Sequence, residues 1–224
     1  MKNSNQKESF LSYEANAWFD RNYQVIKNYD FNRDRVISLI KEYNLDPQSV
    51  LEIGSSAGYR INAIKNIYKE CKVFGIDPSE KAIKYGNEHF KDINLIHGTA
   101  DNLEDFEKQS IDIVVVGFVL YVIDREILFK VVSEIDRVLK NGGILIIVDF
   151  FSERSLKNVY QHIDEFQAYS FKQNYDEIFT SSKLYYLLDK STWNHSEKIL
   201  DATDNYFDKY SISLLKKDIN ASYK

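Results

Sequence analysis

A bare loop near the amino-terminal third of the chain is the first candidate ligand site. The stretch VLEIGSSAGYRI at residues 50–61 carries one carboxylate and then a run of small residues: Glu52, Gly54, Ser55, Ser56, Ala57 and Gly58. Small residues let backbone groups approach a ligand closely, and a following helix adds partial positive charge at its N-terminus. Glu52 could then accept a hydrogen bond from a ligand ammonium group. The alternative is a tight turn whose small residues serve packing alone.

A second carboxylate stands 25 residues later. Asp77 ends the run KVFGID, and an acidic residue at the end of a second strand can accept hydrogen bonds from both hydroxyls of a ribose. The competing interpretation is a helix cap, because Asp77 or Ser79 could cap a helix beginning in EKAIKYG. Together with the small-residue loop, Asp77 favours ribose binding.

The spacing of the loop limits the kind of ligand. A dinucleotide fingerprint requires G-x-G-x-x-G, whose second glycine lets a pyrophosphate approach, whereas this loop reads G-S-S-A-G with Ser56 at that position. A ligand with a ribose and a charged amino-acid tail, but no pyrophosphate, fits better. S-adenosylmethionine is such a ligand, and a nicotinamide-dependent oxidoreductase is the disfavoured alternative.

Alternating apolar runs and helical patterns should position these residues. Strands are expected at 49–54, 72–77, 94–99, 112–118 and 143–151, because these runs are apolar at successive residues, as in strands covered on both faces. A helix is expected over 125–140, capped at residues 141–143 (NGG). Two helices are expected within 9–45, ending before Asp46 and Pro47, and SISLLKKD is a candidate closing strand. This alternation predicts a doubly wound α/β fold with a mostly parallel sheet.

Four stretches of the sequence resemble, in order and spacing, the successive motifs of class I S-adenosylmethionine-dependent methyltransferases. They are VLEIGSSAGYRI, VFGIDPSEKAI, GTADNL and DIVVVGFVLYVIDRE. The resemblance covers residues 45–151. It implies a Rossmann-like, seven-stranded sheet with helices on both faces, and S-adenosylmethionine as cofactor, released as S-adenosylhomocysteine. One departure is Ser56, where many members of the family carry glycine.

The resemblance also implies roles for particular residues. The methionine part of the cofactor would be surrounded by Glu52, Gly54, Ser55, Ser56 and Gly58. Asp77 would bind the ribose, Ile76 and Pro78 would flank the adenine, and Asp101, with Ala100 and Asn102 beside it, would bind the adenine amino group. Gly117 and Phe118 would face the reacting methyl group.

A narrower resemblance involves both ends of the chain. ANAWFDRN at 15–22 and the aromatic segment at 158–179 are similar to segments of methyltransferases from bacterial surface-polysaccharide gene clusters. This resemblance implies that Trp18, Arg21 and Asn22 help to close the cofactor site. It also implies O-methylation of a sugar, a phosphate-type group or another capsule or O-antigen precursor. The alternative for 15–22 is an ordinary amphipathic helix.

Methyl transfer from a sulfonium depends mainly on positioning and needs no covalent protein nucleophile. An alcohol acceptor must lose its proton as it attacks, so a general base is expected. His162, in the aromatic segment, is the best candidate among the histidines, and Tyr121 or Tyr160 could orient the acceptor instead. No metal-ligand cluster is evident, so no metal is expected.

Bulk properties set the remaining expectations. With 224 residues, 44% of them hydrophobic, the chain is predicted to be one domain: a helical cap (1–45), a cofactor-binding core (46–151) and an acceptor or lid region with closing strands (152–224). A net charge of −5, with both signs interspersed, argues against nucleic acid as the main partner. Without a signal-peptide core or an apolar run of membrane-spanning length, we expect a cytoplasmic protein acting on a small molecule. A methyltransferase-like module that binds cofactor without turnover is a further alternative, and the oligomeric state is undetermined.

Overall fold

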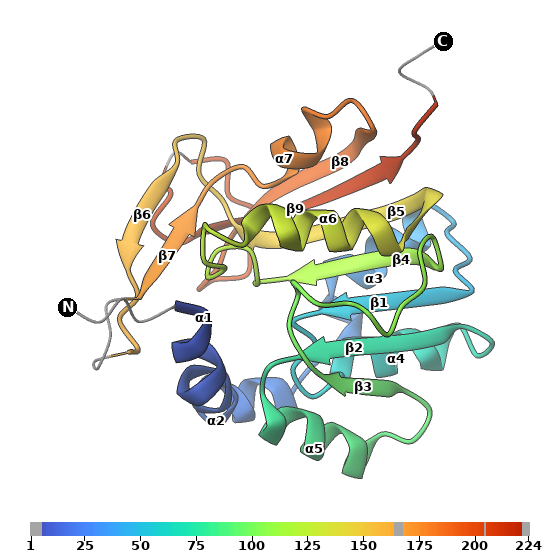
Figure 1. The fold of residues 1–224 in the computed structure, drawn as a ribbon, viewed down its shortest axis with the longest axis horizontal. Helices are drawn as coiled ribbons and strands as arrows, with labels where there is room; N and C mark the ends of the chain where they lie inside the picture. Colours follow the sequence, from blue (N-terminus) through green and yellow to red (C-terminus); the bar gives the residue numbers. More distant parts are fainter. Residues whose placement is uncertain (1–5, 164–167, 204, 221–224) are drawn as a thin grey trace.

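A seven-stranded sheet forms the centre of the computed structural model, which describes residues 6–163, 168–203 and 205–220. The strand order is β3-β2-β1-β4-β5-β9-β8, and neighbouring strands are parallel except in the pairs β5–β9 and β9–β8 at one edge (Figure 1). The strands are β1 (Ser49–Ile53), β2 (Lys72–Asp77), β3 (Asn94–His97), β4 (Ile111–Gly117), β5 (Leu139–Phe150), β8 (Tyr185–Asn194) and β9 (Lys209–Lys217). The predicted doubly wound sheet is confirmed.

Helices cover both faces of this sheet because its parallel strands are apolar on both sides. Along β1, for example, Val50 packs on one side while Leu51 and Ile53 pack on the other. The first side is covered by α3 (Arg35–Glu42) and α4 (Tyr59–Ile67), and the second by α6 (Leu128–Val138) and α7 (Asp176–Thr180). The helix α5 (Glu80–His89) packs beside β3 and α2.

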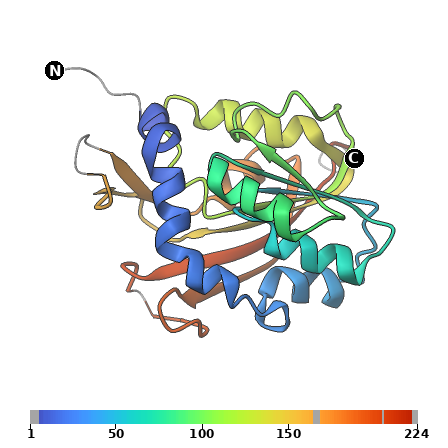
Figure 2. The same ribbon diagram turned by 90° about the horizontal axis from the view of Figure 1, so that it is seen from below.

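The N-terminal segment lies across the carboxyl ends of the parallel strands. It comprises α1 (Gln6–Ser9), a π-helical turn η1 (Phe10–Glu14) and α2 (Ala15–Lys27), followed by the short 3-10 turn η2 (Phe31–Arg33). Beside it lies a two-stranded hairpin of β6 (Leu156–Val159) and β7 (Tyr169–Lys172), as both views show (Figures 1 and 2). The Gln6 side chain joins the two by donating to the carbonyl of Tyr169 at 2.9 Å and accepting from its amide at 3.0 Å.

The helix expected at 125–140 ends earlier in the structure than the sequence predicts. The helix α6 stops at Val138, and Leu139 already pairs with Ile111 as the first residue of β5. The register then shifts, so that Ile144 pairs near Ile113, and the intervening bulge holds Gly142 at φ +84°. The glycine does adopt the left-handed conformation, but in a strand irregularity rather than in a helix cap. The break at residues 46–47 and the closing strand occur as expected, whereas the division into cap, core and lid stays a prediction. Within the part of the chain that the structure describes, no helix has both the length and the apolar character needed to cross a bilayer.

Candidate functional site

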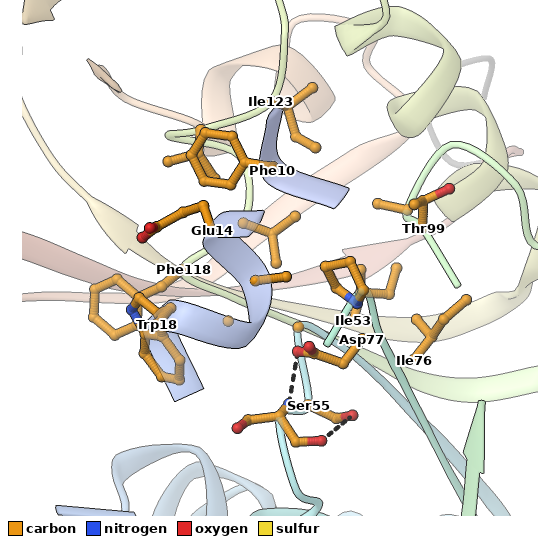
Figure 3. Close-up of a pocket in the computed structure, with 18 of the residues that line it drawn as sticks. Phe10, Glu14, Trp18, Ile53, Ser55, Ile76, Asp77, Thr99, Phe118 and Ile123 are labelled. Atoms are coloured by element: carbon orange, nitrogen blue, oxygen red, sulfur yellow. Dashed lines mark hydrogen bonds between the residues drawn. The ribbon is translucent and has the colours of Figure 1, made fainter. Parts of the chain in front are cut away.

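One cavity of about 360 Å³ opens at the carboxyl ends of the parallel strands, beneath the N-terminal segment (Figure 3). Fourteen of the nineteen residues predicted for the site line it: Trp18, Glu52, Gly54, Ser55, Ser56, Ile76, Asp77, Pro78, Ala100, Asp101, Gly117, Phe118, Tyr121 and Tyr160. The structure therefore brings together side chains from β1, β2, β4 and the N-terminal helix.

The loop after β1 forms the floor of the cavity. The amides of Gly54 and Ser55 both donate to the carbonyl of Ile76, at 2.9 and 3.2 Å, which ties the loop to β2. Gly54 has φ +78°, and a Cβ there would lie 2.4 Å from Val119 Cγ2. Ser56 has φ +48°, a left-handed conformation that explains why glycine suits this position in the family it resembles.

Gly58 does not line the cavity, and its role at this loop is structural. It has φ +81° and stands at the N-cap of α4, where a Cβ would lie 2.8 Å from Ile93 Cδ1. The close approach that requires glycine at this position is therefore to another side chain.

Asp77 ends β2 at the cavity wall. Its two oxygens accept from the amides of Ser56 and Ser79, each at 2.8 Å. Burial raises the pKa of Asp77 to about 6, against the opposing effect of these two amides. The helix cap is Ser79, whose hydroxyl accepts from the Ala82 amide at 3.1 Å. Asp77 is thus not the cap, and its carboxylate remains at the cavity wall.

A buried ionic network lies at the methionine side of the predicted cofactor site. Arg60 donates to Glu52 and, at 2.8 Å, to Asp34, which also accepts from the Tyr29 hydroxyl at 2.8 Å. Burial raises the pKa of Glu52, although Arg60 opposes the shift. Two buried atoms at this place, Glu52 Oε2 and Ser56 Oγ, have no hydrogen-bond partner among the described residues. A ligand ammonium or hydroxyl would satisfy them.

Asp101, which also lines the cavity, is held by lysines. Both of its oxygens accept from Lys7 at 2.8 Å, and Oδ2 also lies 3.3 Å from Lys130. Burial works to raise the pKa of Asp101, but the lysines outweigh it and the pKa lies below its usual value. Lys7 also lines the cavity and was not predicted, whereas Asn102 is exposed and lies outside.

The loop after β4 carries Phe118 and Tyr121 into the cavity. Asp149 anchors this loop, because its carboxylate accepts from the Leu120 amide at 2.8 Å. Burial raises the pKa of Asp149 to about 7, opposed by the surrounding backbone amides. Phe118 itself has φ +52°, so the loop turns sharply at the strand end.

The sequence did not single out Glu14, a buried carboxylate at the end of the π-helical turn. It lines the cavity, is 0% exposed, and accepts hydrogen bonds from Arg21 and from the Tyr160 hydroxyl at 2.6 Å. Arg21, predicted to close the cofactor site, lies outside the cavity and pairs with this carboxylate instead.

His162 does not line the cavity. It is exposed, and its ring packs edge-on against Tyr160 with 5.4 Å between centroids. Its role as a base stays a prediction, and its contact with the site is this packing against Tyr160. The same aromatic segment does contribute Tyr160 to the cavity wall.

Comparison with known proteins gives matches consistent with this geometry. Residues 51–147 match the family model described as a methyltransferase domain. A demethylmenaquinone methyltransferase of Staphylococcus haemolyticus is 25% identical over 91% of this chain and 90% of its own length. The ubiquinone/menaquinone biosynthesis C-methyltransferase UbiE of Campylobacter jejuni is 32% identical, over 52% of this chain and about half (49%) of its own length.

Solved structures share the fold at low sequence identity. The 1,6-didemethyltoxoflavin-N1-methyltransferase of Burkholderia thailandensis, solved with 1,6-didemethyltoxoflavin and S-adenosylhomocysteine, superposes with a TM-score of 0.72. It is 12% identical, and the match covers 97% of this chain and 92% of that one. A Clostridium acetobutylicum S-adenosylmethionine-dependent methyltransferase has a TM-score of 0.61 at 16% identity, covering 90% of this chain and 97% of its own.

Proposed function

We propose that this chain, whose residues 51–147 match a methyltransferase domain, methylates a planar, largely apolar small molecule bearing a hydroxyl group. The predicted enzyme class, the Rossmann-like fold and the cofactor are confirmed by the family match and the shared fold. The nicotinamide alternative is set aside on the same grounds. The acceptor, and the roles of individual residues, are parts of the proposal.

We infer that the loop after β1 and Asp77 hold opposite parts of the cofactor. The support is chemical: Glu52 Oε2 and Ser56 Oγ are buried without partners at the methionine side, and the Asp77 carboxylate faces the cavity beyond them. When bound, the cofactor supplies an electrophilic methyl group. The chain's own residues bind it, orient it and exclude water, which is the main source of rate enhancement in such displacements.

The rest of the cavity wall is largely apolar, and this favours an apolar acceptor over a sugar or a phosphate. Beyond the cofactor residues, the wall is built largely by Phe10, Leu11, Trp18, Tyr121, Val122, Ile123 and Tyr160. A sugar would leave several hydroxyl groups unpaired against such a surface, and each unpaired polar group is costly. A phosphate would need a cation, but the cavity-lining Lys7 is already paired with Asp101, and Arg60 with Glu52 and Asp34. Relatives named for quinone methylation support a flat ring over the polysaccharide precursor expected from the sequence.

Transfer of labelled methyl groups tests the acceptor. With S-adenosylmethionine as donor, we expect label in 1,4-naphthoquinol, kept reduced under anaerobic conditions, at a rate at least about tenfold above that with UDP-glucose or glucose 1-phosphate, because an apolar wall discriminates by roughly 1–3 kcal/mol. Faster labelling of either sugar compound would contradict the proposal and favour the polysaccharide acceptor. Labelling of no acceptor, with intact S-adenosylhomocysteine binding, would favour a non-catalytic module.

The affinity for S-adenosylhomocysteine should depend on pH through Asp77. The ribose hydroxyls are expected to donate to the ionised carboxylate, whose pKa in the free protein is about 6. Binding then favours the deprotonated form, so affinity is complete above that pKa and falls by about tenfold for each pH unit below it. Calorimetry at several pH values measures this, and Asp77→Asn should bind weakly without the pH-dependent step. A wild-type affinity that is flat through pH 6 would contradict the ribose assignment.

A further inference from the structure

The Glu14 carboxylate is fully buried and lines the cavity. It ends the five-residue π-helical turn η1, a rare conformation that is frequent at functional sites. Figure 3 shows the side chain between the rings of Phe10 and Trp18, among the cavity-lining residues. A fully buried carboxylate in an apolar wall is costly unless it is paired, so its partners indicate its use.

Two partners hold Glu14 from different parts of the chain. Arg21, two helical turns along, contacts both carboxylate oxygens, and the hydrogen bond to Glu14 raises the pKa of Arg21. Tyr160, from the aromatic segment 146 residues away, donates its hydroxyl to Oε1 at 2.6 Å. Arg21 thus keeps the carboxylate in position, while Tyr160, which also lines the cavity, donates a hydrogen bond to it.

The Tyr160 hydroxyl is suited to pass a proton and not to retain a negative charge. Burial, the neighbouring Tyr121 and the hydrogen bond to Glu14 all raise the pKa of Tyr160. It therefore stays protonated and donates to Glu14, leaving its oxygen lone pairs to accept. Tyr121 lies near Tyr160 and also lines the cavity, so two phenol groups border the space for the acceptor.

We propose that Glu14 is the terminal base of the reaction and that Tyr160 carries the acceptor's proton to it. This inference rests on the proposed function, because it requires a hydroxyl-bearing acceptor. The acceptor O–H bond breaks as its proton moves to Tyr160 Oη, and the Tyr160 proton moves to Glu14 Oε1. The electron pair left on the acceptor, directly or through its conjugated ring, forms the new bond to the methyl carbon as the carbon–sulfur bond of the donor breaks. Arg21 is a positioning residue for the carboxylate.

Substitutions that preserve shape test the relay. Glu14→Gln retains size and an acceptor oxygen but cannot take the proton, so we expect kcat on 1,4-naphthoquinol to fall by about 10²–10⁴-fold. Tyr160→Phe, which removes the connecting hydroxyl, should fall within the same range. Affinity for S-adenosylhomocysteine should change less than about twofold in both variants. Matched controls are Glu8→Gln and Tyr13→Phe, exposed positions on the same helical segment that should retain wild-type turnover.

Four outcomes for these variants would contradict Glu14 as the terminal base. Near wild-type kcat in Glu14→Gln would return both side chains to a purely structural role. A collapse of turnover in His162→Ala with Glu14→Gln unaffected would instead place the base at His162. A loss of S-adenosylhomocysteine affinity in Glu14→Gln as large as its loss of kcat would also contradict a chemical role. So would a loss of thermal stability large enough to account for the fall in kcat.

A readout without turnover separates this inference from the acceptor proposal. In the wild-type complex with S-adenosylhomocysteine, bound 4-nitrophenol should show the absorbance of its ionised form at a pH where the free compound is mostly neutral, because Glu14 receives the proton through Tyr160. In Glu14→Gln it should remain neutral. If bound 4-nitrophenol is ionised in the wild type and neutral in Glu14→Gln, but 1,4-naphthoquinol is not methylated, the proton relay is supported and the proposed acceptor is contradicted. A neutral or unbound phenol in the wild type would overturn the relay itself.

Discussion

Arg60→Met is expected to lower the free energy of unfolding by about 3–5 kcal/mol, the cost typical of removing one partner from a buried ion pair. Arg60 lies between Glu52 and Asp34, whose side chains are only 3% and 5% exposed. Methionine fills a similar volume but leaves two carboxylates buried without a cation. Urea unfolding followed by circular dichroism measures the difference.

The free energy of unfolding of Arg60→Met should also depend on pH differently from that of the wild type. With Arg60 present, burial already raises the pKa of Glu52. Without Arg60 this carboxyl prefers the protonated form still more in the folded state, so the folded protein binds protons that the unfolded chain does not. Stability of the variant relative to wild type should therefore recover as pH falls from about 7 to about 5. A deficit that grows on acidification would contradict this explanation.

Arg35→Met is the matched control. Arg35 pairs with Glu42 at 2.5 Å, but Glu42 is 53% exposed, and surface pairs contribute only about 0–1 kcal/mol. An equal loss of stability in both variants would mean that the effect comes from the helices and not from the buried network.

The sheet could be predicted because its strands are buried on both faces. Runs such as DIVVVGF leave few alternatives to a parallel central strand, and β4 begins only one residue earlier than expected. The end of α6 could not be predicted in the same way. The NGG sequence at 141–143 is typical of a helix end. Leu139, however, already pairs with Ile111 and joins the sheet before the chain reaches this sequence. Tertiary pairing therefore overrides a cap that the sequence favours.

The cavity wall formed by Glu52 and Asp77 could be predicted because both residues stand at or near strand ends. Glu52 and Asp77 follow from that rule alone, and both line the cavity. Glu14 could not be predicted, because nothing in FLSYE indicates a π-helical turn and its partner Tyr160 is 146 residues distant. His162 was chosen by residue type, and type does not reveal which side of a loop faces the cavity.

Asp77→Ala is expected to weaken binding of S-adenosylhomocysteine by about 1–3 kcal/mol, the cost of losing a charged hydrogen-bond acceptor, or roughly 5- to 150-fold in Kd. The carboxylate lies at the cavity wall and, beyond its bonds to the Ser56 and Ser79 amides, has acceptor capacity for the ribose hydroxyls. Calorimetry at a pH well above 6, where the wild-type group is ionised, measures the difference.

Ser79→Ala separates ribose binding from helix capping. Ser79 is the cap of α5, so its removal should cost about 1 kcal/mol of stability. The affinity for S-adenosylhomocysteine should stay within about twofold of wild type, because the Ser79 amide still donates to Asp77. If Ser79→Ala weakened binding as much as Asp77→Ala, the aspartate would act only by shaping the turn into α5. A loss confined to Asp77→Ala would instead favour direct contact between its carboxylate and the ribose, since both variants perturb the same turn.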